Sequence, residues 1–244
     1  GKNKEQYYTG TFLILDSLRD NWKKEDIEKV IKEFRLLVSP FEEKNNFSIY
    51  ITAPEYDLYE VKLDNNILRQ RYAKVEAKIK TQSIDNGERK TVFCARYADR
   101  EGTIKDFSEE LKKVYICGDL QITIYYFLRD ASLKFDGLKA SEAKAVLDTF
   151  CGVKIYRDGF RVRPYGEEGN DWLLLDKIKI SDPHGYRVGN NQVIGVVNIN
   201  SDANPLLIDS TNREAIIENE AFAQLKQVVN KCINIIENHR YTQY

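Results

Sequence analysis

The spacing of apolar residues along the chain predicts an alternation of helices and strands. Apolar side chains that recur three, four and seven positions apart predict a helix over residues 27–38 with one buried face. Runs that alternate with polar residues, or that are rich in β-branched and aromatic residues, indicate strands. These strands are expected at 11–15, 47–51, 75–79, 91–97, 120–127 and 193–199.

The clearest turn signal is the Asp-Gly pair at 158–159, between two β-rich runs. A two-residue turn there requires positive φ at both positions and predicts a hairpin over 153–165. This register places Lys154 opposite Arg163 and on the same face as Arg161, with Arg157 on the other face. The three residues on the first face are a candidate basic surface for nucleic acid. The alternative is a solvated face with local ion pairs.

The last third of the chain predicts a long helix. Thr-Asn-Arg-Glu at 211–214 has the pattern of a capping box, and a helical pattern with a break near Asn219 follows it. An apolar stripe from Leu225 to Ile236 suits either the core or a contact with a partner helix. The mixture of hairpins and helices predicts an α+β fold with a mixed sheet and a long C-terminal amphipathic helix. A weak domain boundary is expected near 98–113, a charged segment with the pattern of a loop or a short helix.

Composition narrows the function classes. The chain has 244 residues, of which 42% are hydrophobic and 31% are charged, with a net charge of -1. This excludes a disordered acidic or basic tail but leaves room for a local basic patch. No apolar run approaches the roughly 18 residues of a membrane span. No signal peptide opens the chain, so we expect a cytoplasmic protein without a membrane partner.

Residues with metal-binding or catalytic chemistry are sparse. The 4 cysteines form no C-x-x-C pair and the chain has only 2 histidines, so we expect buried thiols and no metal site. Neither nucleotide-binding glycine motif, G-x-x-x-x-G-K-[ST] or G-x-G-x-x-G, occurs. The segment 187–192 could form a nest of backbone N–H groups for an anion, and an ordinary turn is the alternative.

Several longer segments resemble a known family. Gly-Thr-Phe-Leu-Ile-Leu-Asp-Ser-Leu-Arg-Asp-Asn-Trp at 10–22 is similar to the stretch that ends the ATP-binding domain of GHKL ATPases. Tyr-Arg-Asp-Gly-Phe-Arg-Val-Arg-Pro-Tyr-Gly at 156–166 resembles a run of the bacterial histidine kinase-like ATPases, which are related to MORC-like and MutL-like proteins. The segments 169–173, 187–195 and 209–219 resemble the same proteins. The resemblance covers about residues 9–230.

The resemblance implies that this chain is part of a longer ATPase. Residues 1–20 would hold the last strand of the ATPase domain, and 21–244 the transducer domain behind it. In this family the ATP-binding motifs come earlier in the chain, so ATP and Mg²⁺ would bind to an upstream domain. Thr11 matches a threonine near the nucleotide phosphates. Arg213 occupies the place of a transducer lysine that reaches the γ-phosphate, and Asn212 would orient the same loop. The alternative is that Arg213 is merely a residue at the N-terminus of a helix.

Two functional hypotheses follow. The first is a transducer that couples ATP binding to closure of a homodimer and to handling of DNA or a partner protein. This fragment alone would not hydrolyse ATP. The second is a separate module that binds nucleic acid or protein through Lys154, Arg161 and Arg163.

Overall fold

The computed structural model describes residues 11–16, 19–37, 49–63, 66–84, 88–130, 133, 140–182, 185–210 and 215–243. The chain divides into two compact units, Gly1–Asn65 and Asn66–Tyr244. The segment 98–113, where the sequence suggests a weak boundary, lies inside the second unit. It contains the end of one strand and the whole of the next strand of a single sheet.

The first unit combines a helix with a small hairpin. Helix α1 (Lys24–Leu37) is the helix that the apolar spacing predicts. Its first turn is capped because the Asp26 carboxylate accepts a hydrogen bond from the Lys23 backbone N–H at 3.0 Å. The strands β1 (Tyr50–Ala53) and β2 (Leu58–Lys62) pair antiparallel around the short 3-10 helix Pro54–Tyr56.

The strand expected at 11–15 does not form in this chain. Residues 11–16 have no regular secondary structure, and Thr11 is exposed. The four apolar side chains that follow it are exposed as well: Phe12 by 90%, Leu13 by 80%, Ile14 by 84% and Leu15 by 63%. A strand needs a neighbour for its backbone hydrogen bonds, and no described residue supplies one.

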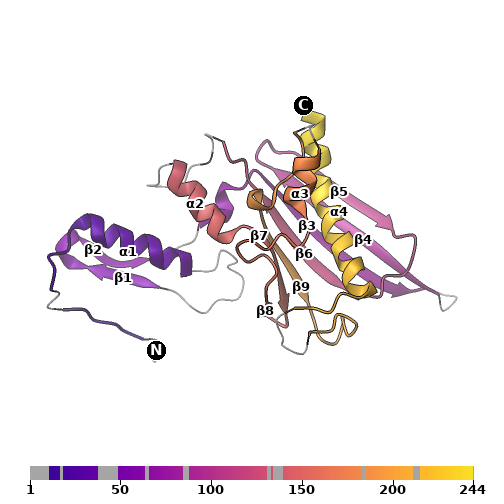
Figure 1. Ribbon diagram of the computed structural model, residues 1–244, viewed down its shortest axis with the longest axis horizontal. Coiled ribbons are helices and arrows are strands. Elements are labelled where there is room, and N and C mark those ends of the chain that lie inside the picture. The colour runs from indigo at the N-terminus through magenta and orange to yellow at the C-terminus, as the bar shows by residue number, and fades with distance from the viewer. Residues whose placement is uncertain are drawn as a thin grey trace, which may run out of the picture. The chain divides into compact units, whose positions relative to one another are not determined.

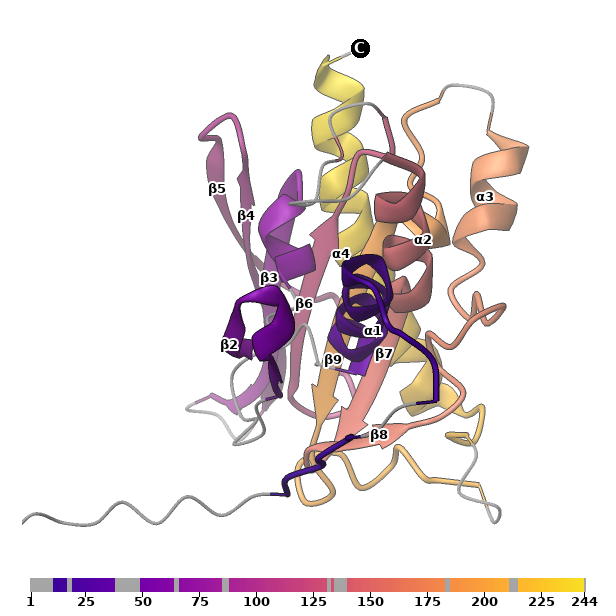
Figure 2. The ribbon, with the colours of Figure 1, turned by 90° about the vertical axis from the view of Figure 1, so that its left-hand side faces the viewer.

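A seven-stranded mixed sheet dominates the second unit, in the order β5-β4-β3-β6-β9-β7-β8. Figure 2 shows the strands in this order. Because the chain combines this mixed sheet with helices, its fold class is α+β. The strands are β3 (Ala73–Ser83), β4 (Arg89–Asp99), β5 (Ile104–Glu110), β6 (Leu120–Tyr126), β7 (Gly152–Arg157), β8 (Phe160–Val162) and β9 (Val193–Ile199). All neighbours are antiparallel except β7 and β9, which are parallel.

The four strands from β5 to β6 form an antiparallel half of the sheet. Residues 75–79 and 91–97 belong to β3 and β4, as the alternating pattern predicts, and Ser83 faces Arg89 at the end of this ladder. The expectation of a loop or short helix at 98–113 is wrong, since β5 pairs with β4 there. Charged residues on β5 hide its strand pattern because it is an edge strand, and charges are common on edge strands.

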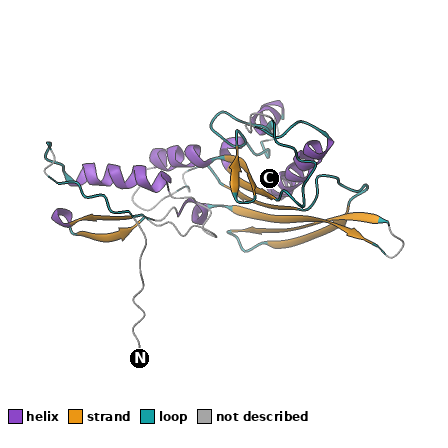
Figure 3. Cartoon of the chain, turned by 90° about the horizontal axis from the view of Figure 1, so that it is seen from below, coloured by secondary structure: helices purple, strands orange, loops and turns teal. Residues whose placement is uncertain are grey.

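Helix α4 (Glu220–Gln243) contacts strands β3, β6 and β4 and lies across them (Figure 1). Seen from below, it lies on one side of the strands (Figure 3). Its apolar stripe faces the sheet: Leu225, Val228, Val229, Cys232 and Ile236 are all buried in the main core. Of the two uses that the sequence left open for this stripe, the core is therefore the one that the structure supports.

Helix α4 begins later than the capping-box pattern suggests. Ile216 pairs with Asp209 in an isolated β-bridge, and residues 215–219 are not helical. The helix starts at Glu220, where the Asn219 side-chain oxygen accepts the Phe222 backbone N–H at 2.9 Å. The expected break near Asn219 is thus the N-cap itself. No helix begins at 215–219, and Arg213 itself lies outside the described residues.

Two shorter helices complete the second unit. Helix α2 (Ala140–Phe150) precedes β7, and α3 (Leu175–Ser181) lies between β8 and β9. A 3-10 turn (Asn190–Gln192) leads into β9. No helix within the described ranges combines the length and the apolarity that a membrane span requires.

Candidate functional site

The Thr-Asn-Arg-Glu segment is flanked by two chain stretches that pair with each other. Ser210 donates its backbone N–H to the Ala215 carbonyl at 2.7 Å, and Ile217 donates to Ile208 at 2.8 Å. Together with the bridge between Asp209 and Ile216, these bonds align residues 208–210 with 215–217. We call these six residues the loop base. Asn212 and Arg213 lie in 211–214, outside the described residues.

Arg157 holds one side of the loop base. Its Nη2 donates to the Leu207 carbonyl at 2.5 Å and lies 2.9 Å from the Asp209 carboxylate. The Arg157 side chain is 14% exposed and the Asp209 side chain 39%, so the guanidinium is largely shielded from water while the carboxylate is partly solvated. A guanidinium that binds a carbonyl and a carboxylate together fixes the direction in which the chain enters the loop base.

Tyr165 holds the other side. Its hydroxyl accepts the Ile216 backbone N–H at 2.9 Å and donates to the Ile216 carbonyl at 3.2 Å. The ring is buried against Trp172 and Phe222, with centroid distances of 5.2 and 5.4 Å. Burial raises the pKa of the Tyr165 hydroxyl, so it stays protonated and able to donate at neutral pH.

The hairpin that carries Arg157 has the predicted turn. Asp158 and Gly159 have φ values of 51° and 86°, and Arg157 faces Phe160 as expected. The Asp158 carboxylate accepts hydrogen bonds from the Ser201 hydroxyl and backbone N–H, and these bonds lower its pKa. The turn is thereby tied to the loop that follows β9.

The predicted exposed basic face does not form. Lys154 is 8% exposed, and its ammonium donates to the Phe150 and Cys151 carbonyls at 2.5 and 3.1 Å. It therefore caps the C-terminal end of α2. Burial, and secondarily the nearby Arg161 charge, lowers the pKa of Lys154 to about 8. The register is as expected, but the buried Lys154 side chain reaches the carbonyls at the end of α2 instead of water.

The two arginines of that face differ from each other. Arg161 donates to the Tyr165 carbonyl at 2.8 Å and to Glu167 at 3.1 Å, so its charge is used within the fold. Arg163 is 78% exposed and lies 3.9 Å from Glu167. Of the three predicted nucleic-acid residues, only Arg163 presents its charge to solvent.

The segment 187–192 does not offer an open anion nest at its glycine. The Gly189 N–H donates to the Gln192 side chain at 3.1 Å, and the Asn190 N–H donates to Asp176 at 2.8 Å. Arg187 binds the buried Glu237 of α4 at 2.6 Å. Side chains of the protein therefore occupy the donors that an anion would need there.

The described residues contain no group of three or more His, Cys, Asp or Glu side chains that could hold a metal ion. Cys117 and Cys232 are buried, and burial raises the pKa of each thiol to about 12. These thiols are therefore not activated nucleophiles. Thr11 lies in the first unit and the loop base in the second.

Sequence reasoning missed the residues that hold the loop base. Arg157 and Asp209 are 52 positions apart, and Tyr165 and Ile216 are 51 apart. No periodicity links positions at such distances. The only signal available was that both partners lie in segments of the same family resemblance.

Comparisons with protein-family models, with curated proteins and with solved structures found no match to this chain.

Proposed function

We propose that this chain is the transducer module of a GHKL-type ATPase. It would couple ATP binding in an upstream domain to closure of a homodimer, and through it to handling of DNA or a partner protein. One observation carries the proposal. The hairpin segment and the 209–219 segment, which both carry the resemblance, contact each other through Arg157 with Asp209 and Tyr165 with Ile216.

These contacts suit a loop that presents Arg213. The residues on both sides of the 211–214 segment pair with each other, so the two ends of that segment are held at fixed positions beside the hairpin. A guanidinium binds phosphate oxygens with two parallel hydrogen bonds and stabilises charge during phosphoryl transfer. Arg213 would thus contact the γ-phosphate of bound ATP, with Asn212 orienting the loop. Mg²⁺ would be held by residues of the upstream domain.

The exposed segment 12–15 supports an upstream domain. Four consecutive apolar side chains that are 63–90% exposed are costly in water, because burying each would be worth about 1.5–3 kcal/mol. In this proposal, a sheet of an upstream ATPase domain would give this segment its strand neighbours and would bring Thr11 near the nucleotide. This is the placement that the resemblance implies for Thr11.

In this proposal the module is a two-state switch. With ATP bound, the contact between Arg213 and the γ-phosphate would lock the transducer against the ATPase domain. After hydrolysis that contact is lost, and the open state becomes favoured. Closure would be driven by a contact that the closed state makes with ATP and the open state does not. Equally tight binding of ATP to both states would not shift the equilibrium.

The test uses the full-length protein, including the reading frame upstream of Gly1. We expect Arg213→Ala to reduce kcat for ATP hydrolysis by about 100- to 1,000-fold, as the loss of one charge-stabilising donor does. ATP binding should remain, because the adenosine and the other phosphates would be held upstream. Arg163→Ala is the matched control, since it removes an exposed arginine of the hairpin.

Two outcomes would overturn the proposal. One is a full-length protein that neither binds nor hydrolyses ATP. The other is an Arg213→Ala variant whose kcat equals that of Arg163→Ala.

A further inference from the structure

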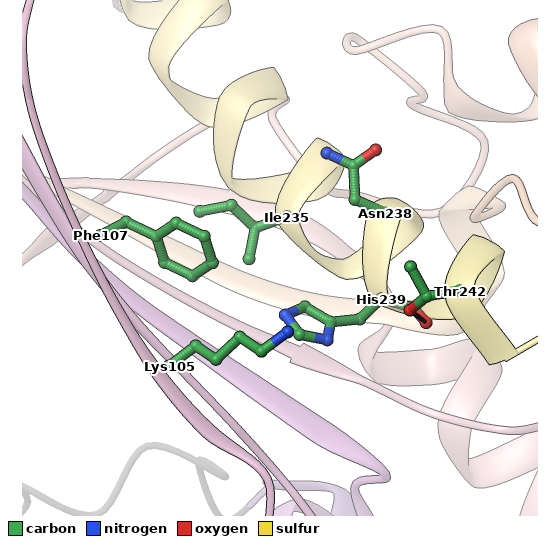
Figure 4. A pocket seen from close by; sticks show the side chains of 6 residues that line it. All are labelled: Lys105, Phe107, Ile235, Asn238, His239 and Thr242. Carbon is green, nitrogen blue, oxygen red and sulfur yellow. Dashed lines mark hydrogen bonds between the residues drawn. The ribbon is translucent and has the colours of Figure 1, made fainter.

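A small hollow lies between the edge strand β5 and the C-terminal end of α4 (Figure 4). Its volume is about 190 Å³. The residues that line it are Lys105, Phe107, Ile235, Asn238, His239 and Thr242. None of them belongs to the loop base or to the hairpin at 153–165, so this hollow is separate from the site described above.

Phe107 and Ile235 form the apolar wall of the hollow. Phe107 is half-buried against the main core, and Ile235 is 8% exposed. Figure 4 shows the two side chains next to each other, one from β5 and one from α4. An apolar cavity of about 150 Å³ is large enough to hold benzene. The hollow therefore has room for a group about the size of one ring.

The His239 imidazole closes one side of the hollow in a fixed orientation. Its ring stacks on the buried Tyr97 ring, with centroids 4.0 Å apart and an angle of 8° between the ring planes. Tyr97 is held in turn by a hydrogen bond from its hydroxyl to Asp99 at 3.1 Å. Within the described ranges, the imidazole itself forms no hydrogen bond. Its ring nitrogens therefore remain able to bond to a ligand.

Lys105 brings a positive charge to the rim of the hollow. It is exposed and forms no ion pair with any other described residue. Nearby cations are paired with carboxylates: Lys90 with Glu110 at 3.1 Å, Arg96 with Asp106 at 2.8 Å, and Lys231 with Glu109 at 2.6 Å.

The hollow contains two groups that can donate to an anion. In Figure 4 the Lys105 side chain extends toward the His239 ring. Burial, and then the Lys105 charge, lowers the pKa of His239, whereas Asp99 acts in the opposite direction. The lining residues include no carboxylate. An incoming anion would therefore supply the charge partner that Lys105 lacks.

The walls restrict the chemistry of a ligand. A purely apolar ligand would cover Lys105 and His239 without replacing their hydrogen bonds to water, which is unfavourable. A bare inorganic anion would leave the apolar wall in contact with water. A nucleotide is too large, because pockets for drug-sized ligands begin near about 300 Å³. A ring that carries one carboxylate matches both the apolar wall and the two donors.

We propose that this hollow binds a small aromatic monocarboxylate. The ring lies against Phe107 and Ile235, and the carboxylate accepts hydrogen bonds from the Lys105 ammonium and from an N–H of the His239 imidazole. Charge-assisted hydrogen bonds of this kind are shorter and stronger than neutral ones. Because the ligand contacts both β5 and α4, its binding should hold the edge strand against the end of the helix.

The test is a titration of the 244-residue chain with benzoate, followed by NMR and by calorimetry. We expect the amide signals of β5 and of the C-terminal turns of α4 to shift. Benzamide has the same ring without the charge, and it should bind at least about 10-fold more weakly than benzoate. Lys105→Met removes one charged donor at an exposed position, so the fold should persist while benzoate binding weakens by about 10- to 100-fold.

Two further variants separate the donors from the general charge of the sheet. Lys78→Met is the matched control, because it removes the same charge from an exposed position of β3 and should leave benzoate binding unchanged. His239→Phe keeps a ring that can stack on Tyr97 but removes the imidazole donor, and it should weaken benzoate binding by about 10-fold.

Three results contradict the proposal. They are a wild-type chain that does not bind benzoate at millimolar concentration, benzamide that binds as tightly as benzoate, and equal losses of benzoate binding in Lys78→Met and Lys105→Met. Because no nucleotide is present in these titrations, their outcome is independent of the proposed ATPase role.

Discussion

The two halves of the seven-stranded sheet differ in how many of their faces are buried. In the half from β5 to β6, one face packs under α4, and the other carries exposed residues such as Lys78 and Arg96. In β9 and β7 neighbouring residues on both faces are buried, as Ile194 and Val197 illustrate. The loop base is attached to this second half, through Arg157 at the end of β7. A strand that is packed on both faces has little freedom, which suits it to hold a loop in place.

The same residue type plays different roles in the two halves. Lys78 and Lys154 both occupy strand positions that alternate with buried apolar residues. Lys78 remains exposed, whereas Lys154 is buried and caps α2. The alternation predicts which face each lysine takes. Only the layer on that face decides whether the lysine meets water.

The largest expected contrast comes from matched isoleucine truncations. Ile155→Ala in β7 removes a fully buried side chain and should lower the free energy of unfolding by about 2–5 kcal/mol. Ile104→Ala in β5 removes a side chain that is 64% exposed, and we expect a loss below about 1 kcal/mol. Urea denaturation of both variants measures the difference. Equal losses would contradict the comparison of the two halves.

A single hydroxyl tests the attachment of the loop base. Tyr165→Phe leaves the buried Ile216 N–H without its acceptor and should cost about 1–3 kcal/mol of stability. Tyr59→Phe, at a residue that is 64% exposed, serves as the control and should change little. Amide hydrogen exchange should also become faster at Ile216 and Ile217 in the first variant. Unchanged exchange there would show that Tyr165 does not hold the loop base.

The smallest effect concerns pH. Native Lys154 releases its proton near its pKa of about 8, while the unfolded chain keeps it to about 10.4. Between these values the unfolded state binds more protons, so this residue makes stability rise with pH. This contribution is fully present above about pH 10.4 and is lost as pH falls to about 8.

Replacing the lysine isolates this contribution. Lys154→Met should flatten the rise between pH 8 and 10 in thermal unfolding, relative to wild type. The exposed Lys78→Met should keep the wild-type profile. A wild-type profile in Lys154→Met would mean that its ammonium is not desolvated in the native state.

Local patterns predicted much of the fold. The strand at 193–199 has the expected bounds, and the turn at 158–159 has positive φ at both residues. These features depend on near neighbours, so a short window of sequence contains their cause. The edge strand β5 was missed because solvent-facing charges replace its apolar residues. The late start of α4 was missed because the bridge between Asp209 and Ile216 takes residues 215–217 out of the helix.

The candidate site was predicted in part. The resemblance indicated Arg213 and the hairpin as separate features, and the predicted register placed Arg157 opposite Phe160, on the other face of the strand from Lys154. That Arg157 and Tyr165 hold the loop base could not be predicted, because their contacts with Asp209 and Ile216 join residues that are more than 50 positions apart. The absence of an exposed basic face could not be predicted for a similar reason. The strand pattern does not tell that Lys154 will be buried at the end of α2.

The sequence by itself determined the α+β class, the apolar stripe of α4, the Asp-Gly turn and the faces of the strands, because each follows from spacing and backbone conformation. Only the tertiary structure decided which faces are covered and which charges are neutralised. It placed Lys154 under α2, Glu237 against Arg187, and Asp209 against Arg157. The physical reason is that burial and charge pairing depend on which distant segments meet, and their free energies arise only when the layers pack.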